Sequence, residues 1–157
     1  MVKSGKRRHS GDGTPLFLGT HEHTLDSKGR VSIPARFRAA LGEPRLIVTT
    51  NVDSGGRCLI AYPVPAFQRF LDNVSALPQF DESVILLRRL HVAGAAECPI
   101  DALGRILIPP TLREHASLRR DVLWAGMGRV IEIWDRRRWA ALSGDGSLAR
   151  RLAKLGL

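Results

Sequence analysis

The sequence of 157 residues is poor in cysteine, with only Cys58 and Cys98. These two residues form no Cys-x-x-Cys pair, and no histidine stands at the spacing of a zinc site. Such usage is typical of two reduced thiols in a cytosolic protein rather than of a disulfide framework or a structural metal. We therefore expect a cytoplasmic protein that holds neither a metal nor another cofactor.

Long apolar runs are also missing, since no stretch approaches the roughly 20 residues of a membrane-spanning helix. Residues 1–14 carry basic side chains but not the apolar segment of a secretion signal. The chain contains no nucleophile elbow, Walker loop, dinucleotide fingerprint or paired-carboxylate arrangement. The glycine loop at 54–57 lacks the Gly-Lys-Ser/Thr ending of a phosphate-binding loop. These absences disfavour a membrane protein, an enzyme and a small-molecule substrate.

Acidic residues are few relative to basic ones, because 15 Asp and Glu stand against 24 Lys and Arg. The formal net charge is +9 and the pI is near 10.9. On so small a protein this surplus creates a field that attracts polyanions, with nucleic acid as the first candidate and an anionic membrane as the second. Arginine predominates among the cations, and its guanidinium suits both phosphate and the guanine edge. The composition therefore predicts a nucleic-acid partner.

One motif occurs twice, because segment 25–38 aligns without a gap with segment 100–113. Internal repeats of this kind show that a fold is built from similar units. The identical positions are Asp26, Gly29, Arg30, Ile33, Pro34 and Arg38, which recur as Asp101, Gly104, Arg105, Ile108, Pro109 and Arg113. Such agreement does not arise by chance, so we predict two related halves.

Similar patterns follow each copy of the motif. Apolar runs at 46–50 and 58–62 flank a glycine loop, as runs at 122–125 and 130–134 flank a Gly-Met-Gly turn. Two short apolar runs separated by such a turn predict a hairpin, and helix signals follow at 63–65 and from 135 onward. Each half is therefore predicted as strand, loop, strand, short helix, hairpin and helix. Between the halves, 83–96 predicts one more helix, which carries Arg88 and Arg89.

The loop between Asp26 and Arg30 has a plain physical interpretation. An aspartate at the start of a turn accepts hydrogen bonds from backbone amides one or two residues further along, which fixes the shape of the loop. Gly29 supplies a positive φ or a close backbone approach. Asp26 and Arg30 could also simply pair to hold the turn, and that alternative applies equally to Asp101 and Arg105. Lys28 is replaced by Leu103 in the second copy, so we expect Arg30 to contribute more to binding than Arg105.

At these residues the sequence resembles the MraZ family of transcriptional regulators. The resemblance runs through 16–19, the two motif segments and 131–135, and covers roughly 16–142. It implies an α+β fold, mainly β, in which two tandem swapped-hairpin AbrB-like halves form a pseudo-two-fold β-barrel with flanking helices. It also implies a ring-shaped homo-oligomer, binding to double-stranded DNA through the Asp-x-x-x-Arg loops, and regulation of the division and cell-wall gene cluster at repeated promoter sites, hence an association with the nucleoid.

The residues expected to contact DNA lie in the two loops and in the helices that follow them. They are Asp26, Lys28, Gly29, Arg30, Arg36, Arg38, Asp101, Gly104, Arg105 and Arg113. The arginines at 136–138 are interpreted first as a solvated helix face and second as a contact to DNA or to another subunit. The three tryptophans are expected in cores or subunit contacts, and the histidines of 21–23 at the surface.

Four segments are expected along the chain. They are a basic disordered arm at 1–15, a first half at 16–80, a second half with a leading helix at 81–142 and a basic helical tail at 143–157. Two other functions stay open at this point. One is an RNA-binding or ribosome-associated protein, although nine aromatic residues are few for stacking on bases. The other is an oligomeric scaffold whose charge serves only solubility.

Overall fold

The computed structural model describes residues 16–53, 55–142 and 146–157, so the expected arm at 1–15 lies outside it. The first half contains β1 (Thr20–Thr24), β2 (Arg30–Ser32), α1 (Ala35–Ala40), β3 (Arg45–Thr50), β4 (Leu59–Tyr62) and α2 (Val64–Ser75). After α3 (Glu82–Leu87) and a π-helical turn η1 (Arg88–Val92), the second half contains β5 (Ala96–Pro99), β6 (Arg105–Leu107), α4 (Pro110–His115), β7 (Asp121–Gly126), β8 (Ile131–Asp135) and α5 (Arg136–Ala140). The predicted order of elements is confirmed in both halves.

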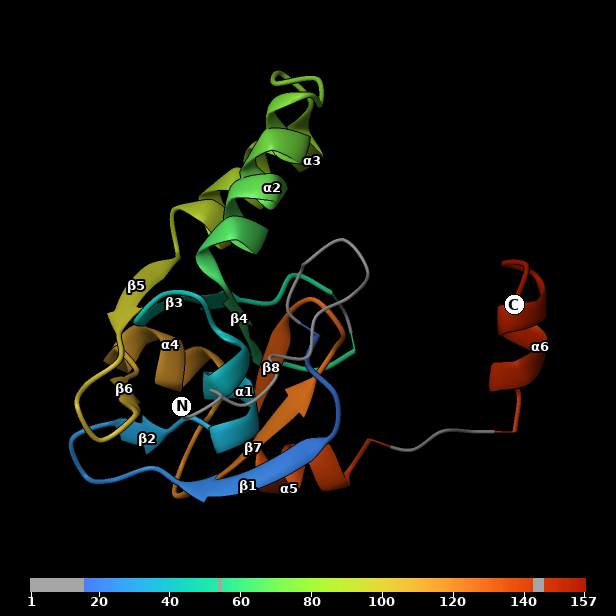
Figure 1. Cartoon of the computed structure of the whole chain (residues 1–157). Coiled ribbons are helices and arrows are strands. Elements are labelled where there is room, and N and C mark those ends of the chain that lie inside the picture. The colour runs from blue at the N-terminus through green and yellow to red at the C-terminus, as the bar shows by residue number, and fades with distance from the viewer. Residues whose placement is uncertain (1–15, 54, 143–145) are drawn as a thin grey trace, which may run out of the picture.

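The two halves are interleaved rather than adjacent (Figure 1). The larger sheet is antiparallel and has the order β1-β7-β8-β4-β3-β5. The first strand of each half therefore pairs with the hairpin of the other half, β1 with β7 and β5 with β3. A pseudo-two-fold axis passes between β8 and β4, because exchanging the halves reproduces the same strand order. The swapped arrangement and the α+β class agree with the prediction.

The remaining two strands, β2 and β6, form a separate antiparallel ribbon. The ribbon also joins the halves, since the backbone N–H of Ile33 donates to Gly104 at 3.0 Å and that of Ile108 donates to Gly29 at 2.9 Å. Within the described residues no ladder links β1 to β5, so hydrogen-bonded closure of the expected barrel is not observed. The β-structure is instead an open six-stranded sheet with the ribbon beside it.

The larger of two hydrophobic clusters among the described residues is shared by both halves. Its fully buried side chains alternate along the strands, as expected for strands with one face on a core. They include Phe17, Val31, Ile33, Phe37, Leu46, Leu59, Ile106, Ile108, Trp124, Ile131 and Ile133. Because each half supplies about half of this set, neither half has a complete core of its own, and small units of this length are marginal without one.

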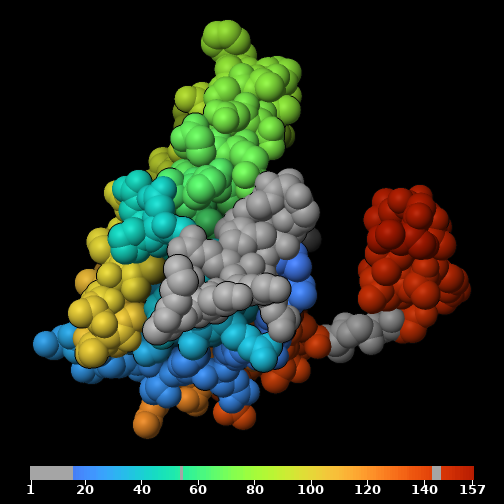
Figure 2. Space-filling model, viewed as in Figure 1, coloured from blue at the N-terminus to red at the C-terminus, as the bar shows by residue number. Residues whose placement is uncertain are grey.

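Helices α2 and α3 form an antiparallel hairpin that projects from the body (Figures 1 and 2). Its base is tied to the sheet by His91, whose ring nitrogens contact the Tyr62 hydroxyl at 2.8 Å and the Thr50 carbonyl at 2.7 Å. Burial lowers the pKa of His91, which keeps the ring neutral at this junction.

The helix predicted over 83–96 is correct only in part. The α-helical hydrogen bonding ends at Leu87 and a π-helical turn continues to Val92, where the Ala93 N–H donates to the Arg88 carbonyl. Ala96 instead begins β5, opposite Val48 of β3. Pairing with the other half's hairpin thus overrides the helical propensity of the alanines, as tertiary contacts commonly do.

The two cysteines and two of the three tryptophans lie in the interior. Cys58 and Cys98 are both buried and form no disulfide. Trp124 and Trp134 are buried, and Trp139 packs edge-on against Trp134.

In the part of the chain that the structure describes, no helix has the length and apolar character needed to cross a membrane. The tail contains α6 (Leu148–Ala153), which lies apart from the body and has no buried residue (Figure 2).

We expect the ribbon to be sensitive to truncation on its inner face only. Ile106 is 1% exposed opposite Val31, whereas its neighbour Leu107 is 55% exposed. Ile106→Ala should lower the free energy of unfolding by about 2–5 kcal/mol through lost burial and a cavity, and Leu107→Ala by less than about 0.5 kcal/mol. Urea unfolding at one fixed protomer concentration measures both values. Similar losses for the two variants would contradict the assigned faces of β6.

Candidate nucleic-acid interface

The first motif forms a tight loop that closes on the Asp26 carboxylate. One oxygen, Oδ1, accepts the backbone N–H groups of Lys28 at 3.0 Å and Arg30 at 2.8 Å. The other, Oδ2, accepts Nε of Arg30 at 2.7 Å. The backbone adds a bond from the Gly29 N–H to the Asp26 carbonyl at 3.0 Å. The carboxylate therefore fixes both the shape of the loop and the direction of the arginine.

The second motif repeats this geometry bond for bond. Asp101 accepts the N–H groups of Leu103 and Arg105 at 2.9 Å each on Oδ1, and Nε of Arg105 at 2.9 Å on Oδ2. The ion pair considered in the sequence is thus present in both copies. It does not exclude binding, because Nε is a single donor and a guanidinium has five. Among the described residues, the Nη groups of Arg30 and Arg105 have no partner.

Both carboxylates are stabilised in the ionised form, so both have a lowered pKa. The backbone N–H of Arg30, followed by its side chain, lowers the pKa of Asp26 from 3.8 to about 2. The pKa of Asp101 is also lowered, with the backbone N–H of Arg105 as the largest cause. A carboxylate that accepts several N–H groups behaves in this way. Both carboxylates therefore stay ionised, and keep their hydrogen bonds to the loops, to a lower pH than an ordinary aspartate would.

The glycines of the motif let each loop receive an arginine from the opposite half. Gly29 and Gly104 both have a positive φ, of 90° and 77°. A Cβ on Gly29 would lie 2.8 Å from Cζ of Arg113, and a Cβ on Gly104 would collide with the guanidinium of Arg38. Arg38 on α1 therefore covers the second loop, and Arg113 on α4 covers the first.

The motif arginines share the outer face of the β2–β6 ribbon. Arg30 stands opposite Leu107 and Arg105 stands opposite Ser32, while Val31 and Ile106 face the core between them. Arg30 and Arg105 are thus diagonal neighbours, whose Cα atoms lie about 7–8 Å apart in such a ladder. The ribbon therefore presents two forked cations of known orientation on one narrow surface.

Most of the residues predicted for the site are brought together by this arrangement. Asp26, Lys28, Gly29, Arg30 and Arg113 meet at the first loop, and Asp101, Gly104, Arg105 and Arg38 meet at the second. Arg36 is exposed on α1 and makes no hydrogen bond or ion pair with a described residue.

Two basic residues beside the first loop escaped the sequence prediction. Arg119 and Arg120 precede β7, and the Leu25 N–H donates to the Arg120 carbonyl at 2.7 Å, directly before Asp26. The adjacent arginines are visible in the sequence, but the pairing that places them here joins Thr24 to Asp121 across the two halves. Only the register of β1 against β7 reveals this proximity.

The pKa of Asp26 offers a test of the loop. Titration of its carboxyl ¹³C resonance should give a midpoint near pH 2. Arg30→Gln should raise that pKa only part of the way toward 3.8, because the variant loses the side-chain bond and keeps the backbone N–H. The folded-state pKa is the lower one, so this group stabilises the fold above its unfolded pKa and loses that contribution as the pH falls toward 2.

Arg105→Gln is the matched control, since it should leave the Asp26 titration unchanged. A wild-type midpoint near the ordinary value would contradict the loop geometry.

Comparisons with known proteins agree with this architecture. The family model described as "MraZ protein, putative antitoxin-like" matches residues 16–89 and 92–149. A protein of Acetivibrio thermocellus named transcriptional regulator MraZ is 40% identical over 147 residues, which cover 90% of this chain and all of that protein. A protein of the same name from Roseiflexus castenholzii is 43% identical over 145 residues, covering 89% and 99% of the two chains.

A likeness to the solution structure of PHS018 from Pyrococcus horikoshii covers 74% of this chain and 87% of that one. Its TM-score of 0.33 and identity of 16% are too low to support an argument. The family match spans both copies of the motif and nearly all of the described residues. The chain therefore belongs to the MraZ family.

Proposed function

We propose that this protein is a sequence-specific DNA-binding regulator of transcription, which acts as a ring-shaped oligomer at repeated promoter sites of the division and cell-wall gene cluster. The proposal includes a cytoplasmic, nucleoid-associated localisation. The relatives are named transcriptional regulators. The observation that carries the DNA contact is the pair of matching Asp-Arg loops, with both arginines on the outer face of the β2–β6 ribbon.

The shape and chemistry of the ribbon suit duplex DNA. A two-stranded antiparallel ribbon fits the major groove, which is about 12 Å wide. Each motif arginine is oriented by its aspartate through Nε, so its Nη groups can donate to a phosphate or to a guanine edge. Orientation before binding reduces the entropy lost when the side chain is ordered on DNA. The Asp-Arg pair therefore serves the turn and the contact together.

A ring would give the weak single contact its strength. Two arginines and a few neighbours per protomer supply little affinity alone, whereas linked copies on adjacent repeats gain through effective concentration. The projecting hairpin carries exposed apolar side chains suited to a subunit contact, with Phe80 96%, Leu86 54% and Leu90 49% exposed. Size-exclusion chromatography with light scattering should give one closed oligomer, and a monomer at micromolar concentration would count against the ring.

The main test removes the motif arginines one at a time. Arg30→Gln and Arg105→Gln should each weaken binding to a repeat-bearing duplex and reduce the slope of log K against log salt by about 1 if the contact is to phosphate. We expect the larger loss for Arg30→Gln, because Lys28 beside it is Leu103 in the second loop. Fluorescence anisotropy over a salt series measures both quantities.

Arg69→Gln is the matched control, because this exposed arginine lies on α2, away from the β2–β6 ribbon. Light scattering verifies that this variant keeps the wild-type oligomeric state, since α2 belongs to the hairpin offered as a subunit contact. Thermal unfolding of each variant separates binding from stability. Equal binding of repeat-bearing and scrambled duplexes would contradict a specific regulator, and preference for RNA would favour the RNA-binding alternative. A larger loss for Arg105→Gln would reverse the ranking of the loops.

A further inference from the structure

The pseudo-two-fold axis relates two regions whose charges differ. The Leu25 N–H before the first loop donates to the Arg120 carbonyl, and the Ile100 N–H before the second donates to the Pro44 carbonyl at 2.8 Å. These matching bonds make Arg120 the counterpart of Pro44, and Arg119 the counterpart of Glu43. Two cations flank the first loop where the second has an acid and a proline.

A second pair of segments shows the same difference. At the pseudo-axis Ile60 of β4 stands opposite Glu132 of β8. Counting outward from this pair, Arg136 and Arg137 at the start of α5 correspond to Val64 and Pro65 at the start of α2. The first loop therefore adjoins four arginines that have no basic counterpart beside the second.

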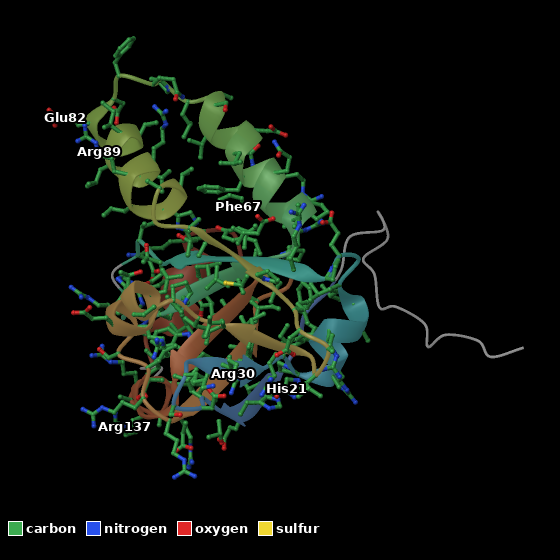
Figure 3. All side chains as sticks on the ribbon, turned by 90° about the vertical axis from the view of Figure 1, so that its left-hand side faces the viewer. His21, Arg30, Phe67, Glu82, Arg89 and Arg137 are labelled. Carbon is green, nitrogen blue, oxygen red and sulfur yellow. The ribbon has the colours of Figure 1, made fainter. Side chains whose placement is uncertain are left out.

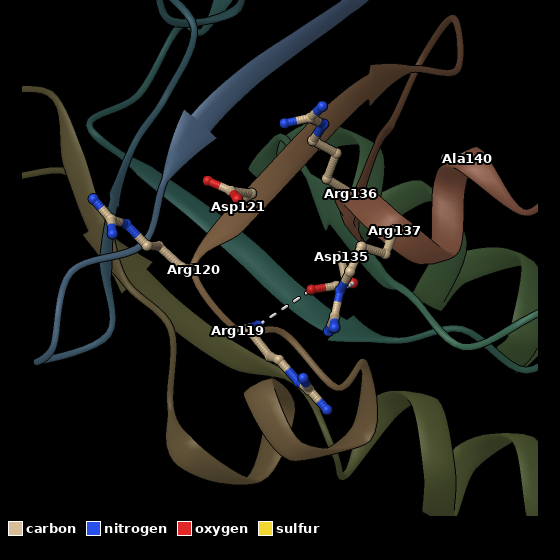
Figure 4. Close-up of a pocket in the computed structure, with 7 residues that line it drawn as sticks. All are labelled: Arg119, Arg120, Asp121, Asp135, Arg136, Arg137 and Ala140. Carbon is tan, nitrogen blue, oxygen red and sulfur yellow. Dashed lines mark hydrogen bonds and ion pairs between the residues drawn. The ribbon is translucent and has the colours of Figure 1, made fainter.

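These four arginines surround one open pocket (Figure 4). Its volume is about 460 Å³, many times the roughly 30 Å³ that a water molecule occupies. The lining residues are Arg119, Arg120, Asp121, Asp135, Arg136, Arg137 and Ala140. Four guanidinium groups against two carboxylates leave the lining with a surplus of positive charge.

The internal ion pairs of the pocket are long and incomplete. Asp135 is 2% exposed, and its two carboxylate oxygens accept the Arg119 backbone N–H and Nε of Arg137, both at 3.4 Å. Arg136 is 3.5 Å from Glu22 on β1. The side chains of Arg119 and Arg120 have no ion pair with a described residue. These arginines therefore have N–H donors left to offer to an anion.

The opposite side is neutralised by its own contacts. There Arg45 forms ion pairs with both Glu43 and Glu97, the latter being the counterpart of Glu22. One cation thus stands against two acids beside the second loop. An approaching polyanion is therefore attracted more strongly to the end of the ribbon beside the first loop than to the other end.

We propose that the four-arginine pocket is a second phosphate-binding site, which holds the DNA backbone beside the first loop and so fixes the direction in which each protomer lies on DNA. This inference rests on the proposed function. Arg30 and Arg137 both lie in the part of the body farther from the helical hairpin (Figure 3). The Arg120 carbonyl also binds the residue directly before the first loop, so we expect one duplex to contact both the loop and the pocket. The ribbon alone is nearly symmetric and would accept DNA in either direction, whereas the four arginines have no basic counterparts at the other end.

The test compares Arg120→Gln/Arg136→Gln with Arg88→Gln/Arg89→Gln in the full-length protein. Both double variants remove two exposed cations, and the control pair lies on the projecting hairpin, away from the pocket (Figure 3). Because the hairpin is also the proposed subunit contact, light scattering first verifies that both variants keep the wild-type oligomeric state. The pocket variant should bind a repeat-bearing duplex about 10-fold or more weakly near physiological salt, with a salt slope reduced by about 2. The control variant should keep the wild-type slope.

A hydroxyl-radical footprint checks the direction. The wild type should protect extra nucleotides of the DNA backbone from cleavage on one side of each site. The pocket variant should lose only that additional protection. A footprint that is symmetric in the wild type, or unchanged affinity and slope in the pocket variant, would overturn the pocket proposal while leaving DNA binding intact. No binding by the wild type would instead overturn the proposed function.

A further arm addresses free phosphate compounds as the occupant. Inorganic phosphate is titrated while the arginine Nε–H resonances are followed by NMR. If phosphate shifts the pocket resonances while the pocket variant binds DNA as the wild type does, the site serves a small anion and the proposal fails.

Discussion

The structure depends on the exchange of strands between its two halves. Strand β1 pairs with the β7–β8 hairpin and β5 pairs with the β3–β4 hairpin, so each half supplies the edge strand of the other half's hairpin. The core is shared for the same reason, with Leu46 and Ile133 contributed by different halves to one cluster. The same exchange brings β2 against β6 and so places two loops from distant parts of the chain on a single surface. Fold and candidate interface thus follow from one constraint.

The sequence carried much of this information because the motif is local. An aspartate that binds nearby amides needs no distant partner, so the bond from the Lys28 N–H to Asp26 could be predicted from the repeat, whereas the bond from the Arg30 N–H, four residues onward, was not. The hairpins were also predictable from alternating runs and glycine turns. Ala96 was assigned wrongly because its state depends on pairing with β3. The position of Arg120 was missed for the same reason, since strand register between halves is a property of the whole fold.

Symmetry and its loss have separate roles in this protein. The paired carboxylate bonds are nearly identical in the two loops, so the backbone framework is symmetric. The side chains around that framework are not, as the exchange of Lys28 for Leu103 and of Arg119 for Glu43 shows. A symmetric scaffold with unequal ends combines a rigid presentation of two arginines with a means of telling one end of a site from the other. The proposed pocket is the strongest expression of that inequality.

The arginines that lie over the glycines of the opposite loops have a consequence for how such a sequence can change. Arg38 occupies the space that a side chain at Gly104 would need, and Arg113 does the same at Gly29. Each glycine therefore packs against an arginine far away in the chain. A larger residue at the glycine would collide with that arginine, so a substitution there requires the arginine to move or change as well. The exposed Lys28 side chain has no such packing constraint, and the matching position in the second loop is a leucine, Leu103. The two copies can therefore differ at the exposed positions of each loop. A substitution there can change what the loop binds without changing the packing that holds the loop in place.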